Sequence, residues 1–102
     1  MPDGLPDLPF HDAEVLTVRL DRDGPTMELD IEVFAQLPEA RTERLRFREI
    51  SDLEIGGLNE QNVLFNVVAE RAADGLWDVT LQSSYGLGGT FRCVSIEALP
   101  SR

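Results

Sequence analysis

The chain has little with which to build a covalently or metal-stabilised structure. Its 102 residues include one cysteine, Cys93, and one histidine, His11. A single cysteine excludes an internal disulfide and any metal site made of several thiolates. Cys93 lies in the strand-like run 89–96, so we expect a buried apolar residue rather than a reactive thiol. A chain of this length can still fold around one core without such aids.

Long hydrophobic runs and a basic start are also missing. The first nine residues, MPDGLPDLP, are acidic and proline-rich, unlike a signal peptide. No run approaches the roughly 20 apolar residues that a membrane span needs. We therefore expect a cytoplasmic protein with no membrane contact. Residues 1–9 would form an extended arm on a single β domain that covers residues 1–102.

Basic residues are few. Nine of them stand against nineteen acidic residues, which gives a formal charge of −10. This charge repels phosphate backbones, so the protein is not expected to bind nucleic acid. The same charge favours solubility and would speed the encounter with a basic protein partner.

Apolar and polar residues alternate through much of the chain, as in half-buried strands. Two such runs flank Asp23-Gly24 and predict a hairpin. The residues expected on its inner face are Leu16, Val18, Leu20, Met27, Leu29, Ile31 and Val33.

Acidic residues alternate on the second strand of this hairpin, and arginines alternate on the run that follows it. Residues 26–34 carry Glu28, Asp30 and Glu32 on the outer face, and residues 43–50 carry Arg44, Arg46 and Arg48 around inward Leu45 and Phe47. Opposite charges across an antiparallel pair stabilise it, so these strands are predicted to be neighbours in register. The alternative, an anion-binding arginine patch, is disfavoured because the adjacent acids would neutralise it.

The segment 59–73 is ambiguous. Asn59 could cap a helix that Gly75 ends, but the run 63–68 is rich in β-favouring residues and Asp74-Gly75 is a hairpin signal. We favour a strand. With the last strand at 90–99, the chain is predicted to be mostly β: an antiparallel meander of six to seven strands, forming a sandwich or a partly open barrel.

Two polar stretches interrupt the alternation where loops would present function. The first contains Asn59, Gln61 and Asn62, and the second contains Ser83, Ser84 and Tyr85. Their amides and hydroxyls could satisfy loop backbone groups. Alternatively, they could contact a protein partner, for which the tyrosine ring is well suited.

Catalysis and cofactor binding find little support. His11 and Asp12 are adjacent and would point to opposite faces of an extended segment, so they make a poor dyad for Ser83 or Ser84. A structural or protein-contact role is favoured for both. No metal-binding motif is present, and the glycines at 86–89 lack the lysine and following helix of a phosphate loop. We expect no enzyme activity, no metal and no cofactor.

The chain resembles the bacterial immunity protein 50 family. The resemblance rests on Phe10-His-Asp-Ala-Glu-Val15, on Asn59-Glu-Gln-Asn-Val63, on Ser83-Ser-Tyr-Gly86 and on Gly89-Thr-Phe-Arg-Cys93. It implies a small intracellular protein that neutralises a cognate protein toxin by direct binding, without catalysis. The acidity would suit a basic toxin.

The alternative is a non-catalytic structural or small-ligand-binding β module. Pairing of exposed strand edges could also give a homodimer.

Overall fold

The computed structural model describes residues 10–34 and 37–99, so the arm predicted at residues 1–9 lies outside the described part. Within it all regular structure is β. The strands are β1 (Glu14–Asp21), β2 (Thr26–Val33), β3 (Arg41–Arg48), β4 (Ser51–Gly56), β5 (Val63–Arg71), β6 (Trp77–Tyr85), β7 (Gly88–Cys93) and β8 (Ser95–Leu99). The prediction of a mostly β, antiparallel fold is confirmed, with eight strands in the described ranges in place of six or seven.

The additional strand arises because the predicted last strand bends at Val94. β7 ends at Cys93 and β8 begins at Ser95. The backbone N–H of Val94 donates to the carbonyl oxygen of Arg48 at 2.9 Å, which ties the bend to the end of β3. β7 then pairs with β4 and β6, whereas β8 pairs with β3.

The strand order is β4-β7-β6-β5-β1-β2-β3-β8. Strands β1–β2–β3 and β5–β6–β7 are each a meander, but β4 follows β3 and pairs with β7, while β8 follows β7 and pairs with β3. β4 therefore precedes β5 in the chain but lies at the far edge of its layer, and β8 returns from the end of the chain to complete the layer of β1–β3. If β1 is exchanged with β5, β2 with β6, β3 with β7 and β4 with β8, the strand order reads the same from the opposite edge of the sheet. The topology has this pseudo-two-fold symmetry although the sequence shows no repeat.

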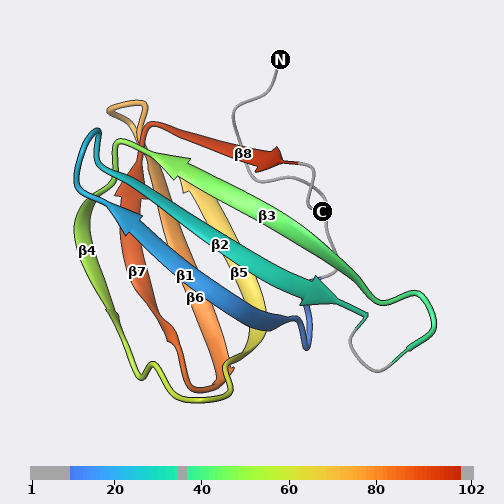
Figure 1. Cartoon of the computed structure of the whole chain (residues 1–102). Helices are drawn as coiled ribbons and strands as arrows, with labels where there is room; N and C mark the ends of the chain where they lie inside the picture. Colours follow the sequence, from blue (N-terminus) through green and yellow to red (C-terminus); the bar gives the residue numbers. More distant parts are fainter. Residues whose placement is uncertain (1–9, 35–36, 100–102) are drawn as a thin grey trace.

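The open sheet folds over so that its halves face each other (Figure 1). β1, β2, β3 and β8 form the front layer in this view, and β4–β7 lie behind them. Between β1 and β5 the register contains one residue pair among the described residues, Glu14 with Val63. The rings of Phe47 on β3 and Phe91 on β7 meet edge to face across the core, 4.8 Å apart.

The core residues of β2 and β3 lie where the alternation predicts. The inward side chains of both strands are fully buried: Met27, Leu29, Ile31, Val33, Leu45 and Phe47. Cys93 is also buried, and Trp77 packs half-buried against the same core. One hydrophobic cluster thus includes residues from both layers.

The predicted inner face of β1 is wrong at Leu16 and Leu20. The β1–β2 register shifts between Val15 and Thr17, so Leu16 is the extra residue of a β-bulge and is 47% exposed, while Val15 takes the core position. Leu20 pairs with buried Met27 but lies near the strand end, where 51% of it stays exposed.

The predicted pairing of the strands at 26–34 and 43–50 is confirmed, although Glu32 faces Thr42 and not an arginine. Glu28 pairs with Arg46 and Asp30 with Arg44, so β2 and β3 are neighbours in the expected register. The ambiguous segment contains strand β5, which pairs with β6 through a turn at 72–76.

The shared core provides a stability test. Replacing Phe47 by alanine removes a buried ring and its contact with Phe91, so we expect the free energy of unfolding to fall by about 3–5 kcal/mol. Leu20→Ala is the control, because its side chain is half exposed, and should cost less than about 1 kcal/mol. Urea denaturation of both variants measures the difference. Equal effects would contradict a core shared by the two layers.

Candidate functional site

The two polar stretches of the sequence meet at one end of the molecule. The loop 57–62 enters β5, and the turn at 86–87 joins β6 to β7. The first residues of β1 lie at the same end, where Val15 N–H donates to the Asn62 carbonyl at 2.8 Å. This end is the lower part of Figure 1.

Asn62 holds these segments together. Within the described ranges it is the one polar or charged residue that is buried. Its Oδ1 accepts from the backbone N–H groups of Asn59 and Leu87, both at 2.9 Å, and its Nδ2 donates to the Asn59 carbonyl at 2.9 Å. One amide therefore closes its own loop and links it to the β6–β7 turn.

The glycine of this turn is required by space and by backbone conformation. Gly86 has a φ of +85°, and a Cβ there would collide with Asn62 Oδ1 and lie 2.8 Å from the Gln61 carbonyl oxygen. Any side chain would both strain the backbone and displace the Asn62 amide.

The other residues of the two stretches lie on the surface around Asn62. Asn59 Nδ2 donates to the Tyr85 hydroxyl at 3.3 Å, and Tyr85 remains 55% exposed. The Ser83 hydroxyl donates to the Gly86 carbonyl at 3.0 Å. Gln61 and Ser84 are exposed. The structure thus brings the two stretches together as one surface region.

His11 and Asp12 lie in the turn before β1. Both side chains are exposed, and His11 Nδ1 is 3.4 Å from Asp12 Oδ2. The His11 ring packs edge to face on Phe65, with ring centroids 5.2 Å apart. Asp12 has a φ of +63°, and its N–H donates to the Leu64 carbonyl at 2.9 Å, so this turn is tied to β5.

Among the described residues, His11 contacts Asp12 and Phe65. No hydrogen bond found in that part of the chain joins it to Ser83 or Ser84, and the Ser83 hydroxyl donates to the Gly86 carbonyl. Across residues 10–34 and 37–99, no group of three His, Cys, Asp or Glu side chains is arranged to hold a metal ion. The same residues contain no helix long and apolar enough to cross a membrane.

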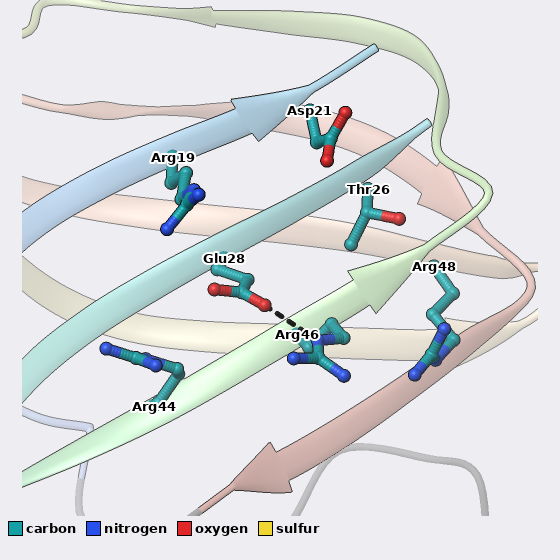
Figure 2. A pocket seen from close by; sticks show the side chains of 7 residues that line it. All are labelled: Arg19, Asp21, Thr26, Glu28, Arg44, Arg46 and Arg48. Atoms are coloured by element: carbon teal, nitrogen blue, oxygen red, sulfur yellow. Dashed lines mark hydrogen bonds and ion pairs between the residues drawn. The ribbon is translucent and has the colours of Figure 1, made fainter. Parts of the chain in front are cut away.

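The outer face of the front layer holds the predicted charge ladder (Figure 2). Arg46 Nε donates to Glu28 Oε2 and Arg44 Nε to Asp30 Oδ1, both at 2.7 Å. Arg48 continues the series with Glu97 on β8 at 2.9 Å. A hollow of about 400 Å³ on this face is lined by Arg19, Asp21, Thr26, Glu28, Arg44, Arg46 and Arg48. Three of its four arginines are held by carboxylates, which weakens the anion-patch alternative.

Asp30 accepts side-chain hydrogen bonds from both Arg44 and Thr17. The Arg44 hydrogen bond holds the pKa of its carboxyl below the ordinary value of 3.8, against an opposing effect of burial, and the Thr17 hydroxyl adds a further hydrogen bond at 2.7 Å. The ladder therefore favours the ionised form of Asp30 in the folded state.

Three exposed apolar residues near this end were missed or misplaced by sequence reasoning: Leu16, Leu58 and Phe65. Phe65 sits between the shifted pairs of Leu64 and Asn66 in the β5–β6 register, so it is extra in a bulge, like Leu16. Consecutive apolar pairs, Val15-Leu16 and Leu64-Phe65, break the period-two alternation. That break is the signal that could have indicated the bulges.

The geometry thus defines a small antiparallel β protein with a structured polar loop end and a charge-paired outer face. The family model of Immunity protein 50 matches residues 5–99, and the chain belongs to that family. No curated protein and no solved structure matches the chain.

Asn62 can be tested by substitution. Asn62→Ala leaves the N–H groups of Asn59 and Leu87 without their acceptor, and we expect it to lower the free energy of unfolding by about 2–4 kcal/mol. Gly86→Ala should cost about 1–3 kcal/mol through backbone strain and the collision. Gln61→Ala, on the exposed side of the same loop, is the control and should be nearly neutral. Chemical denaturation measures all three, and a neutral Asn62→Ala would contradict the assignment.

The Asp30 pairing predicts a pH dependence. Because the folded-state pKa is lowered, the stabilisation by ionised Asp30 is fully present above the unfolded value near 3.8 and is lost as the pH falls through the lower folded pKa. We therefore expect Asp30→Asn to destabilise the protein at pH 7 and to lose this effect below that window. Thermal unfolding between pH 7 and pH 2.5 measures it. Glu39→Gln, at an exposed loop position, should show no comparable change.

Proposed function

We propose that this protein neutralises a cognate protein toxin by binding it directly, without catalysis and without a cofactor, in the cytoplasm of the cell that makes both. The observation that carries the proposal is the family match over residues 5–99. The net charge of −10 supports a basic toxin, because complementary charge raises the association rate.

The described surface agrees with binding rather than turnover. The lone histidine is exposed and contacts Asp12 and Phe65, and the Ser83 hydroxyl is used within its own turn. His11 and Ser83, the best candidate residues for hydrolysis, therefore make contacts within their own turns and with Phe65.

The alternative, a small-ligand β module, would require an apolar pocket with a few convergent polar groups. The hollow in Figure 2 is instead lined by charged side chains apart from Thr26. That lining makes this hollow unsuited to a small apolar ligand.

Co-expression tests the proposal. The proposal predicts a toxin domain encoded beside this gene that arrests growth when expressed alone, and expression of this protein should restore growth. The two proteins should also co-purify as a complex from the rescued cells. Growth arrest that persists despite soluble expression of both, with no complex, would contradict the proposal.

Binding and catalysis are distinguished by stoichiometry and by His11→Ala. Neutralisation by binding requires this protein in at least equimolar amount, whereas an enzyme would act at catalytic ratios. We therefore expect titration of purified toxin activity to end near equivalence. We also expect His11→Ala to keep that end point, since no step depends on an imidazole. Complete inactivation at a small fraction of equivalence would contradict this expectation.

A further inference from the structure

Exposed apolar side chains gather where the halves of the sheet meet. In the described residues eight large hydrophobic side chains are exposed, and four of them lie around the junction of β1 with β5. We call these four the seam patch: Leu16, Leu58, Phe65 and Tyr85, which are 47%, 66%, 51% and 55% exposed. An exposed apolar cluster of this kind is typical of an interaction site.

Contacts connect three members of the patch, Leu16, Leu58 and Tyr85, through Asn59. Leu16 and Leu58 line the same hollow of about 250 Å³, together with Asn59. Asn59 in turn donates to the Tyr85 hydroxyl. Phe65 lies beyond the pair Glu14–Val63, beneath the His11 ring. With β-strand spacing of about 3.3 Å per residue, the antiparallel register places Leu16 and Phe65 roughly 10–15 Å apart.

Two bulges produce this exposure at equivalent positions. Leu16 is the third residue of β1 and Phe65 is the third residue of β5, and these strands correspond in the pseudo-two-fold topology. In each case the preceding residue, Val15 or Leu64, takes the core position. The bulges therefore direct an additional large apolar residue outward on both sides of the seam. Bulges often re-aim side chains in this way at functional sites.

The charges around the patch have one sign. Its rim acids are Asp12, Glu14 and Glu60, and the segments 10–18, 57–66 and 83–86 contain no arginine or lysine. Glu14 is also paired in the sheet with Glu32, a like-charged neighbour, which opposes the pairing. Elsewhere on the front layer the acids of the ladder are matched by arginines.

We propose that the seam patch is the surface that binds the toxin, and that the toxin presents there a basic surface around an apolar depression. This inference rests on the proposed function and adds where the contact is made. An apolar centre with a charged rim is the arrangement of specific protein interfaces, in which a few central side chains carry most of the affinity. The rim acids steer a basic partner toward that centre.

A second copy of this chain is a poorer occupant. In a two-fold interface each patch faces itself, so the rim acids of one protomer would meet those of the other. The sheet edges carry their own obstacles to pairing, since β4 is interrupted by a register shift after Ser51 and β8 has five residues. The charge therefore favours a basic partner over self-association.

The experiment measures binding of the purified toxin domain encoded beside this gene, in a catalytically inactive form, by surface plasmon resonance. We expect Phe65→Ala and Leu58→Ser each to raise Kd at least tenfold, mainly through faster dissociation. Leu20→Ala is the matched control, because Leu20 is equally exposed but lies outside the seam patch, and it should change Kd less than threefold. Thermal unfolding checks that each variant remains folded. Leu58, in a loop, keeps the test valid if Phe65→Ala is unstable.

Substitution of the rim acids should change the association rate. Glu14→Gln and Glu60→Gln should slow association and weaken its dependence on salt, whereas Glu39→Gln should leave both unchanged.

Two failures are distinguishable. If the unmodified protein binds the toxin but the seam variants bind equally well, the inference is overturned and the proposed function stands. If the unmodified protein does not bind, both fall. Sedimentation experiments test for a homodimer. If the protein is a dimer that Leu16→Asp dissociates, the inference is also overturned, because a second copy then covers the patch.

Discussion

The two crossings of the chain between the layers are the constraint on which the structure depends. Each crossing carries the chain from one layer to the other, at the end of β3 and at Val94. The chain enters the back layer at its outer edge as β4 and returns to the front layer as β8, so the front layer is completed only by the last strand. The Phe47–Phe91 contact and the single hydrophobic cluster follow from this arrangement. The layers consequently share one core while needing little direct pairing between β1 and β5.

Sparse pairing at the seam explains the features that gather there. A continuous ladder between β1 and β5 would fix every side chain by simple alternation. With one register pair in the described part, the chain can accommodate a bulge beside each strand start and still bury Val15 and Leu64. The loops supply the remaining order, through the Asn62 amide and the hydrogen bond from Asp12 to Leu64. Hydrogen bonds of the loops therefore order the seam, although β1 and β5 do not form a continuous ladder there. Such an ordered surface suits the binding of a partner.

Much of the fold could be predicted from local patterns, because those patterns act over neighbouring strands. Alternation predicts the core residues of β2 and β3, and charge complementarity predicts their register. The bulge at Leu16 escaped the same reasoning, since period-two counting assumes that no residue is inserted. The division of the last strand at Val94 was also not predicted. The chain crosses between the layers at this residue, and no local turn signal marks the crossing.

The candidate site shows the same limit. Asn59, Gln61, Asn62 and Tyr85 stood out as polar residues against an alternating background. Their segments meet only because the β6–β7 turn folds onto the loop before β5, and nothing local in the sequence shows that contact. The role of Asn62 as a buried hydrogen-bond centre is distinct from that of its exposed neighbours, and residue type alone could not separate them. Leu58 was overlooked because it follows two glycines in what reads as a connecting loop.

The acidic residues of the protein are not distributed evenly with respect to their arginine partners. An acidic protein gains solubility wherever its carboxylates lie, so net charge alone does not identify a surface. Here arginines hold Asp30, Glu28 and Glu97 in ion pairs, which offsets much of the charge above β2 and β3. The acids beside the seam have no such counterions in their segments. Exposed charges act over about one Debye length, roughly 8–10 Å at physiological salt, so unpaired acids dominate the field close to the seam. A basic molecule approaching from solution is therefore drawn toward the end that also exposes apolar side chains, and steering and close contact act at the same place.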